Sequence, residues 1–367
     1  MKILYVTTIG GTMDFFKSYI KHLIDTGNIV NIATNEDDSK VSNFYRSLGC
    51  IIYQIDMSRS PLRSGNIIAI KQIKEIVTEE KYDIVHCHTP IAAMCTRFAC
   101  RKARMHGTKV FYTAHGFHFY KGAPKINWLL FFPMEKICSY FTDILITINQ
   151  EDYLFAKKHL NAQYIKYVPG VGIDLEKFGK YNPCLKRKEL DIPDDAIVYL
   201  SVGELNRNKN HETVIRAISK LENNSYYLIA GQGKLHEHLQ GLIDELELNQ
   251  RVKLLGYRRD IPELLCAADV FVFPSYREGL PVSVMEAMAS QLPIVCSNIR
   301  GNIDLVDEKG GILFNPQSVD ECVTALKKII NEEGTYLGQY NMCKVEKYGV
   351  KSINSILCKI YMESEKN

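Results

Sequence analysis

The chain has 367 residues, more than one ordinary hydrophobic core accommodates, and two domains are therefore expected. Hydrophobic residues make up 46% of it and charged residues 24%, which is typical of a globular protein. The formal net charge of +3 does not indicate the basic field of a general nucleic-acid-binding protein, although a local basic patch remains open.

The first residues, MKILYVTTIGG, lack the long apolar core and the small-residue cleavage site of a signal peptide. No run in the sequence approaches the roughly 18 apolar residues that span a bilayer. The 11 cysteines are odd in number and have no CxxC spacing, so reduced thiols are the simplest interpretation. We therefore expect a cytoplasmic protein, either soluble or peripherally bound on the inner face of the cytoplasmic membrane.

Short apolar runs alternate with helical patterns from the first residue onward. Strands are expected at 3–8, 29–34, 51–55, 84–87, 109–113, 144–148 and 164–168, and the helices between them include 15–25, 66–79 and 92–104. Strands as uniformly apolar as these are typical of a parallel sheet with helices on both faces. The pattern predicts a doubly wound α/β domain.

Residues 167–193 break this alternation with several turn formers, and we interpret them as an interdomain link. The alternation then restarts, with strands expected at 196–202, 226–230, 252–254, 270–273 and 294–297, and helices at 211–221, 234–247, 261–266 and 281–290. A final helix is expected at 351–363, with residues 349–367 packing back on the first domain. We predict Rossmann-like domains at 1–180 and 181–348, forming a cleft where the carboxyl ends of both sheets face each other.

Two loops at the carboxyl ends of strands in the second domain combine glycine with cations. Gly203 precedes Arg207 and Lys209 at a helix entrance, where backbone N–H groups and cations can hold a diphosphate. A solvated polar loop explains that stretch equally well. Gly231 opens a GxG turn before the next helix, which would allow close backbone approach of a ligand or simply form a tight turn.

A third loop, after the strand at 252–254, contains Tyr257 and Arg258. Its main-chain groups could bind a nucleobase. A plain connection between a strand and a helix explains the local sequence as well.

Two glutamates flank the expected start of a helix in the stretch REGLPVSVMEAMAS. Glu278 comes before Gly-Leu-Pro, and Glu286 lies inside the following apolar run. Because Pro281 suits the first turn of a helix, Glu278 would lie beside free N–H groups that can bind anionic or sugar oxygens. Those groups belong to Gly279, Leu280 and Val282. Glu286 would be partly buried, and a ligand hydroxyl could satisfy its carboxylate; a helix-surface glutamate and a simple N-terminal charge are the alternatives.

The wider context resembles a known family. The stretch ADVFVFPS at 268–275, then EGLP at 278–281 and EAMA at 286–289, resembles the donor site of retaining family 4 glycosyltransferases of the GT-B fold. That family's signature is two glutamates separated by seven residues, the spacing of Glu278 and Glu286. The stretch YTAHGFHF at 112–119 is similar to the family's acceptor-side loop. The resemblance covers nearly the whole chain and extends to bacterial enzymes that assemble capsule and exopolysaccharide repeat units.

The resemblance implies a nucleotide-sugar donor site in the second domain and an acceptor site in the first. Glu286 would bind ribose hydroxyls, Glu278 would contact the transferred sugar, and Lys209 would neutralise the diphosphate leaving group. His115 would lie beside the reacting anomeric centre, so the expected catalytic residues are His115, Glu278 and Lys209. The rest of the expected donor site is Gly203, Arg207, Gly231, Tyr257, Arg258, Gly279, Leu280, Pro281, Val282 and Glu286. The expected acceptor and phosphate loop contributes Gly10, Gly11 and His118.

Two positions depart from the family pattern. Glu204 stands where the family usually has an arginine directly after the loop glycine, and Arg207 is a candidate for the missing cation. Gln291 stands where a glycine is common before the proline, which affects only the turn.

The family's chemistry retains the configuration at the anomeric carbon, and the leaving phosphate helps to deprotonate the acceptor. Such a reaction needs charge stabilisation on the diphosphate more than a strong protein base. The resemblance implies a hexosyl- or N-acetylhexosaminyltransferase without cofactor or metal, using a UDP-sugar and a glycan acceptor carried on polyprenyl diphosphate. The adjacent pairs Asp37-Asp38 and Asp194-Asp195 do not form the Asp-x-Asp motif of metal-dependent transferases.

Two further groups of residues have alternative interpretations. His86, Cys87 and His88, with the histidines at 115 and 118, could suggest zinc, but no fourth ligand has metal-like spacing. Arg97, Arg101 and Arg104 would share one helix face, and the stretch KGAPKINWLLFF at 121–132 mixes lysines with tryptophan and phenylalanine. Basic charge beside such residues is what peripheral contact with anionic lipid needs, but a solvated helix and an ordinary core helix explain the two segments at least as well.

Two rival functions share the expected fold. A nicotinamide oxidoreductase is one, but the first strand is followed by Thr7-Thr8-Ile9-Gly10-Gly11 instead of G-x-G-x-x-G. A non-catalytic nucleotide-sugar-binding protein is the other. The partners expected from the leading interpretation are a nucleotide sugar and a glycan or lipid-linked sugar acceptor, with no nucleic acid.

Overall fold

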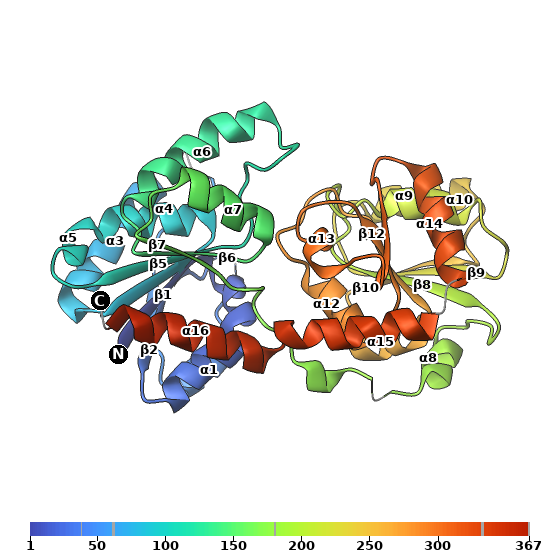
Figure 1. The fold of residues 1–367 in the computed structure, drawn as a ribbon, viewed down its shortest axis with the longest axis horizontal. Coiled ribbons are helices and arrows are strands. Elements are labelled where there is room, and N and C mark those ends of the chain that lie inside the picture. Colours follow the sequence, from blue (N-terminus) through green and yellow to red (C-terminus); the bar gives the residue numbers. More distant parts are fainter. Residues whose placement is uncertain (38, 61–62, 180, 332–333, 366–367) are drawn as a thin grey trace. The chain divides into compact units, whose positions relative to one another are not determined.

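A computed structural model of the chain describes residues 1–37, 39–60, 63–179, 181–331 and 334–365. The chain divides into two compact units, residues Met1–Gly172 with Val350–Asn367, and residues Ile173–Gly349. Each unit is an α/β structure with a parallel sheet between helices (Figure 1). The first of the two segments of the first unit ends at Gly172, before the boundary expected at residue 180.

Within the described residues, the first unit contains a seven-stranded parallel sheet in the order β3-β2-β1-β4-β5-β6-β7. The strands are β1 (Lys2–Ile9), β2 (Ile29–Asn35), β3 (Ile52–Gln54), β4 (Ile84–His88), β5 (Lys109–Ala114), β6 (Ile144–Thr147) and β7 (Tyr164–Tyr167). The order reverses direction at β1 and β4, and such a switch point leaves a crevice at the carboxyl ends of the two strands. All seven strands overlap the runs expected from the sequence.

The helices of the first unit lie on both faces of its sheet (Figure 1). They are α1 (Lys17–Asp25), α2 (Asn43–Ser47), α3 (Gly65–Glu80), α4 (Pro90–Ala99), α5 (Arg101–Arg104), α6 (Lys125–Ser139), α7 (Gln150–His159) and α16 (Val350–Glu365), with a 3₁₀ helix at Gly10–Phe16. The expected helix at 92–104 is interrupted at Cys100, between α4 and α5. Helix α16 packs beside α1.

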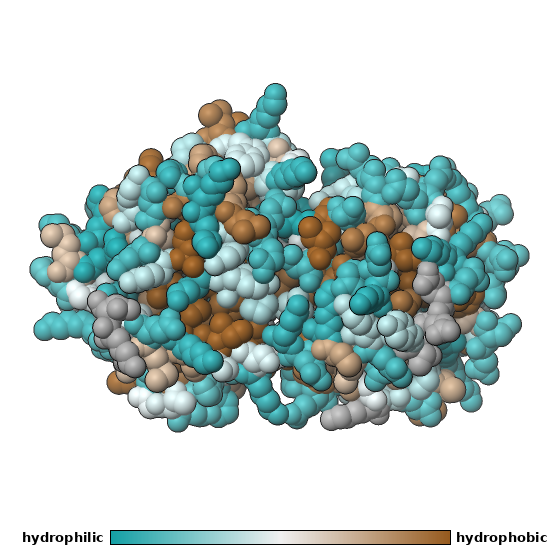
Figure 2. Space-filling model, viewed as in Figure 1, coloured by the Kyte–Doolittle hydropathy of each residue, from teal (hydrophilic) through white to brown (hydrophobic). Residues whose placement is uncertain are grey.

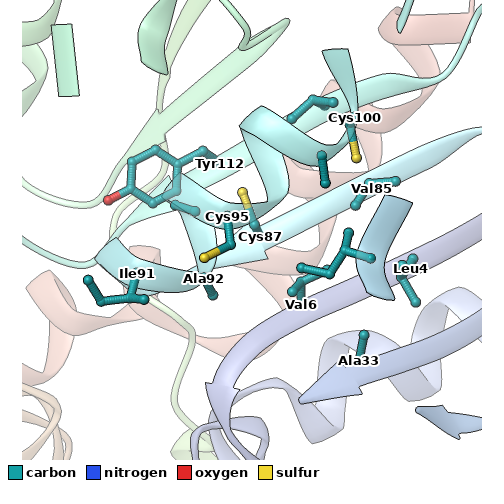
Figure 3. Close-up of a cluster of buried hydrophobic side chains, with 14 of the residues drawn as sticks. Leu4, Val6, Ala33, Val85, Cys87, Ile91, Ala92, Cys95, Cys100 and Tyr112 are labelled. Atoms are coloured by element: carbon teal, nitrogen blue, oxygen red, sulfur yellow. The ribbon is translucent and has the colours of Figure 1, made fainter. Parts of the chain in front are cut away.

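The strands of this sheet are buried on both faces because successive side chains alternate between two cores. Leu4 and Val6 point to the face covered by α3 and α4 (Figure 3), whereas Ile3 and Tyr5 point to the face covered by α1 and α16. This double burial explains why the strands are uniformly apolar in sequence.

The second unit contains, within the described residues, a six-stranded parallel sheet in the order β10-β9-β8-β11-β12-β13. The strands are β8 (Ile197–Val202), β9 (Ser225–Ala230), β10 (Val252–Gly256), β11 (Val270–Phe273), β12 (Ile294–Ser297) and β13 (Gly311–Phe314). Here the strand order reverses at β8 and β11. Five of these strands match expected runs, and β13 was not predicted.

The helices of the second unit are α8 (Pro183–Glu189), α9 (His211–Ile218), α10 (His236–Glu245), α11 (Ile261–Ala267), α12 (Val282–Ala289), α13 (Asn302–Leu305), α14 (Val319–Asn331) and α15 (Gly334–Val345), with 3₁₀ helices at Leu175–Lys177 and Glu346–Tyr348. Helix α8 lies inside the expected interdomain link. It belongs to the second unit because Lys186 pairs with Asp260 and Glu263 of the α11 region. Across the part of the chain that the structure describes, no helix combines the length and the apolarity that a bilayer span requires.

Candidate functional site

The loops that follow β8 and β11 meet at the switch point of the second sheet. The first contributes Lys209 and the second contributes Glu278, and the Lys209 Nζ lies 2.8 Å from the Glu278 Oε1. Both side chains are largely buried, at 20% and 14% exposed. The Lys209 Nζ also lies 4.6 Å from the centroid of the Phe273 ring at the end of β11. The structure therefore brings together two of the three residues expected to be catalytic.

Hydrogen bonds hold the Lys209 loop against the end of β11. Asn208 donates to the Arg277 carbonyl at 2.9 Å, and its own carbonyl accepts from the Tyr276 N–H at 2.8 Å. Asn210 has a left-handed backbone at φ 53°, which asparagine tolerates better than most residues, and its amide donates to the Pro274 carbonyl at 3.1 Å. These bonds determine the position of the backbone that carries Lys209.

Glycines allow the loops of this site to pack at very short range. A Cβ on Gly231 would lie 1.8 Å from the Gly203 carbonyl oxygen, and one on Gly203 would lie 3.3 Å from the Lys209 side chain. A Cβ on Gly233 would lie 2.4 Å from the Leu205 carbonyl oxygen, so both glycines of the GxG turn pack against the loop after β8, a contact that the sequence did not predict.

The segment after β12 supports Glu278 and was not predicted from the sequence. Arg300, 6% exposed, donates its Nε–H to the Glu278 carbonyl at 3.2 Å. Gly301 has φ 81°, and a Cβ there would lie 2.3 Å from the Gly279 carbonyl oxygen. An arginine followed by a glycine after an apolar strand was the only sequence feature that pointed to this contact, and many turns share it.

Helix α12 begins next to Glu278, with Pro281 as its N-cap residue. The first N–H groups of a helix have no acceptor within the helix, so the backbone from Gly279 to Val282 can donate to an anionic or sugar oxygen. The end of β11 thus presents an ion pair and a helix N-terminus at the same place.

Glu286 lies one turn further along α12 and is half-buried, between neighbours in the helix that are fully buried. Burial raises the pKa of its carboxyl to about 7, and the charge of Lys177 opposes this shift. None of the described residues forms a hydrogen bond or an ion pair with this carboxyl. Hydrogen-bond donors from a ligand would stabilise the ionised form of this partly buried carboxyl, which has no donor of its own in the part of the chain that the structure describes.

Three further side chains were expected in the donor site, those of Arg207, Tyr257 and Arg258. Arg258 is committed to an ion-pair network with Asp260 and Glu189, which also contains Lys186. Tyr257 is 66% exposed. Arg207 is exposed and lines a depression of about 390 Å³ next to α9 and α10, together with residues that include His211, His238 and Tyr276.

In the first unit, His115 follows β5 and is partly buried. Its Nε2 lies 3.1 Å from Nδ1 of His88, at the end of the adjacent strand β4. Burial lowers the pKa of His115 to about 4, so the ring is neutral near pH 7. His118 is directed elsewhere, with its ring 4.7 Å from that of Phe131 on α6.

Gly10 and Gly11 lie in the 3₁₀ helix after β1. A Cβ on Gly10 would lie 2.3 Å from the Ser39 carbonyl oxygen, and one on Gly11 would lie 2.5 Å from the Ser39 hydroxyl. Close packing against the backbone of this neighbouring loop explains Gly10, whereas a Cβ on Gly11 would meet only the Ser39 side chain.

Both ring nitrogens of His86 form hydrogen bonds, with the Tyr361 hydroxyl at 2.5 Å and the Thr113 hydroxyl at 2.8 Å. This leaves no ring nitrogen for the zinc alternative at His86. Of the two aspartate pairs, Asp194 and Asp195 line a depression at the amino ends of β8 and β11, away from Glu278. Asp38 lies outside the described residues.

The arginines expected on one basic helix face are separated by the fold. Arg97 is fully buried and forms a two-pronged ion pair with Glu135, at 2.5 and 3.0 Å, because α6 covers that side of α4. Arg104 pairs with Asp143 at 2.7 Å, and only Arg101 remains largely exposed. The expected shared basic face of these three residues is therefore wrong.

The sequence of the chain is similar to known families and proteins. Residues 185–345 match the family described as "Glycosyl transferases group 1", and residues 2–149 match "Glycosyl transferase 4-like". The chain is 40% identical over 270 residues to "Putative glycosyltransferase EpsD" of Bacillus subtilis (strain 168), covering 71% of each chain. It is 34% identical over 290 residues to the Escherichia coli protein "UDP-Gal:alpha-D-GlcNAc-diphosphoundecaprenol alpha-1,3-galactosyltransferase", covering 74% of each chain.

Solved structures share the fold across the whole chain. Anabaena Alr3699/HepE in complex with UDP superposes with a TM-score of 0.82 at 19% identity, covering 99% of this chain and 100% of that one. The lipopolysaccharide glycosyltransferase WaaG superposes with a TM-score of 0.77 at 16% identity, covering 98% and 99%. At these identities the likeness shows the fold alone.

Proposed function

This chain belongs to the family 4 glycosyltransferases of the GT-B fold, and on that premise we propose that it is a retaining enzyme of bacterial surface polysaccharide synthesis. It transfers a hexose or N-acetylhexosamine from a UDP-sugar to a glycan acceptor carried on polyprenyl diphosphate. The observation that carries the proposal is the Lys209–Glu278 pair at the N-terminus of α12, with Glu286 one turn further.

Each group of this site suits one part of a nucleotide sugar. Lys209 and the first N–H groups of α12 supply positive charge for the diphosphate, and that stabilisation grows as the bond to the anomeric carbon breaks. Glu278 accepts from hydroxyls of the transferred sugar, and Glu286 accepts from the ribose hydroxyls. The leaving phosphate oxygen takes the proton of the acceptor hydroxyl while the new glycosidic bond forms on the same face.

The names of the relatives support the choice of donor and acceptor. The Escherichia coli relative is named for a UDP-galactose donor and a diphosphoundecaprenol-linked acceptor. Solved structures of Anabaena Alr3699/HepE contain UDP or UDP-glucose. Two sources thus favour UDP over GDP, and one favours the lipid-linked acceptor.

The proposal is tested with a panel of nucleotide sugars and NAD. We expect a UDP-sugar to raise the melting temperature of the protein and NAD to leave it unchanged. The best donor is then incubated with a polyprenyl-diphosphate-linked sugar, and the anomeric configuration of the product is read by NMR. Glu278→Gln should reduce transfer at least tenfold, and wild-type transfer by this variant would refute the sugar contact. Donor binding without turnover would instead favour the non-catalytic alternative.

Peripheral contact with the membrane is part of the same proposal, and α6 is the segment that carries it. Its exposed apolar side chains recur at helical spacing on one face, and they are Ile126, Leu129, Leu130, Ile137 and, at the C-cap, Tyr140. Figure 2 shows apolar residues at the upper edge of the first unit, over α6. Lys121 and Lys125, also exposed, lie near the N-terminal end of the helix and suit anionic headgroups.

The tryptophan expected at this interface is placed differently. Trp128 is half-buried against Phe119, Phe132 and Phe155, so it anchors α6 to its own unit. The buried Arg97–Glu135 ion pair joins the same helix to α4. One side of α6 is therefore packed against its own unit, and the exposed aliphatic side chains lie on the other side of the same helix.

Flotation with anionic liposomes tests the membrane contact. The wild-type protein should float with the vesicles, and the double variant Leu129→Ser, Leu130→Ser should remain in solution. A matched control is Ile67→Ser, Ile68→Ser on α3, where both isoleucines are also exposed, at 62% and 48%. A wild-type protein that stays wholly soluble, or a control that loses binding equally, would argue against α6 as the contact.

A further inference from the structure

His88 and His115 are paired across the carboxyl ends of β4 and β5. His88 Nδ1 lies 3.1 Å from His115 Nε2. A neutral imidazole has one N–H donor and one acceptor nitrogen, so at this distance one ring must donate its proton and the other must accept. The pair therefore couples the tautomer of His115 to that of a residue one strand away.

The ring of His88 is held firmly in place. It is 2% exposed, stacks on Tyr5 at 5.4 Å and 16°, and lies 4.2 Å from the rings of both Phe16 and His86. His86 is itself fixed by its bonds to Tyr361 and Thr113.

The rings of this group are neutral. Burial lowers the pKa of His86 to about 3 and lowers that of His88 well below its usual value, as it lowers that of His115. Each ring therefore carries one N–H proton near pH 7. The open question is which of its two nitrogens carries that proton.

The surroundings of His88 Nε2 distinguish the two possible arrangements. This atom is buried and has no hydrogen-bond partner among the described residues. If His115 donated, the proton of His88 would sit on Nε2 as a buried N–H without an acceptor. If His88 donates from Nδ1, its Nε2 is a buried acceptor without a donor. A buried acceptor without a donor is more common in proteins than a buried N–H without an acceptor, so the second arrangement is favoured.

We infer that His88 is a positioning residue, which donates its Nδ1–H to His115 Nε2 and so holds the proton of His115 on Nδ1. Within the described residues, Nδ1 of His115 forms no hydrogen bond. Its N–H is therefore available to a ligand, whereas its lone pair is occupied.

This inference rests on the proposed function and assigns His115 one role in it. His115 acts as a hydrogen-bond donor to an oxygen of the donor or acceptor, and it does not remove the proton of the acceptor hydroxyl. That role agrees with a reaction in which the leaving phosphate oxygen receives the proton.

The tautomer is measured directly by NMR on protein labelled with ¹⁵N-histidine, without any substrate. Long-range ¹H–¹⁵N correlations distinguish a protonated Nδ1 from a protonated Nε2, and the His115 signals are assigned by their absence in His115→Asn. We expect His115 to be protonated on Nδ1 near pH 7. A proton on Nε2 in the wild-type protein would overturn the inference.

Three variants separate positioning from packing. His88→Asn keeps an amide N–H near the position of Nδ1 and should preserve the His115 tautomer. His88→Phe keeps a ring in the stack but removes the donor, so the tautomer should shift and kcat/KM should fall about tenfold, as for the loss of one neutral hydrogen bond. Phe16→Leu disturbs the ring packing around both His88 and His115 but removes no hydrogen-bond donor, so it should leave the tautomer unchanged.

The inference and the proposed function fail in different experiments. An unchanged His115 tautomer in His88→Phe would overturn the positioning role, whatever the protein transfers. Absence of turnover with every UDP-sugar would overturn the proposed function, and the NMR result on the free protein would not depend on it.

Discussion

Glu278 and Glu286 flank the start of the same helix, yet their carboxyls have different environments. Glu278 is paired with Lys209, so its charge is balanced before any ligand binds. Glu286 has no described partner, and burial raises its pKa to about 7. This difference fits the two proposed roles. Glu278 is already oriented by Lys209 to accept from the transferred sugar, whereas the carboxyl of Glu286 would be stabilised more strongly by hydrogen bonds from the ribose hydroxyls.

The raised pKa of Glu286 predicts that donor binding weakens as the pH falls. Below about pH 7 the free protein holds a protonated carboxyl, which accepts ribose hydroxyls less well, and binding would lower its pKa. The affinity for UDP-glucose should fall about tenfold between pH 8 and pH 6 if only the carboxylate binds. Titration calorimetry measures this, and a nucleotide sugar is preferable to UDP because its phosphates do not titrate in this range.

Glu286→Gln is the control for that pH dependence. It should bind UDP-glucose more weakly than the wild-type protein at pH 8 and should lose most of the change between pH 8 and pH 6. A flat profile for the wild-type protein would contradict the assignment of Glu286 to the ribose.

At the scale of elements, the loop that carries Lys209 depends on a close approach to the next loop. The Gly203 carbonyl occupies the place that a side chain at 231 would need. The two loops therefore pack in direct backbone contact at this point.

Gly231→Ala should displace the Lys209 loop and reduce the affinity for a UDP-sugar by tenfold or more. The Cβ would lie 1.8 Å from the Gly203 oxygen, so one of the two loops must shift. Gly241→Ala is a matched control in α10, where a Cβ meets nothing within 4 Å; it should leave binding unchanged and stabilise the helix by roughly 0.5–1 kcal/mol. Equal affinities in both variants would contradict the packing argument.

The Arg97–Glu135 pair joins α4 to α6, and removal of one partner should be costly. Arg97→Met should lower the free energy of unfolding of the first unit by about 3–5 kcal/mol, because Glu135 would remain buried without its cation. The double variant with Glu135→Leu should recover a large part of this loss. The single tryptophan, Trp128, lies on α6 and reports this transition by fluorescence in a urea titration. A single variant as stable as the wild type would show that the pair is not buried.

At the scale of the molecule, the last helix of the chain belongs to the same unit as the first strand. Ile353, Ile360 and Tyr361 of α16 lie in the core that also contains Ile3 and Tyr5. The chain thus leaves the first unit after Gly172, forms the second, and returns at Val350.

Tyr361→Ala should destabilise the first unit by about 3–5 kcal/mol, the range for removing a buried aromatic side chain. The neighbouring variant Met362→Ala, at a residue that is 57% exposed, should change the free energy of unfolding by less than 0.5 kcal/mol. The Trp128 fluorescence transition measures both variants. Similar effects of the two would indicate that α16 does not contribute to the core as described.

Much of the fold was predictable because its elements have local patterns. The strands at 270–273 and 294–297 were predicted with their observed bounds, since each is a short apolar run between turn formers. Strand β13 was missed because GILF is four residues long, begins with the second of two adjacent glycines and has no alternation. Helix α14 was missed although Cys322, Ala325, Leu326 and Ile329 recur at helical spacing, a pattern that was available in the sequence.

The sequence by itself determined the two βα alternations, the position of the two glutamates around a helix start and the family resemblance, because these depend on residues close together in the chain. Only the tertiary structure decided which distant residues meet. Arg97 and Glu135, 38 residues apart, form a buried pair instead of a basic surface, and ring nitrogens of His88 and His115, 27 residues apart, lie within hydrogen-bonding distance. The physical reason is that hydrogen bonds and desolvation depend on distances across the folded chain, which periodicity along the sequence does not encode.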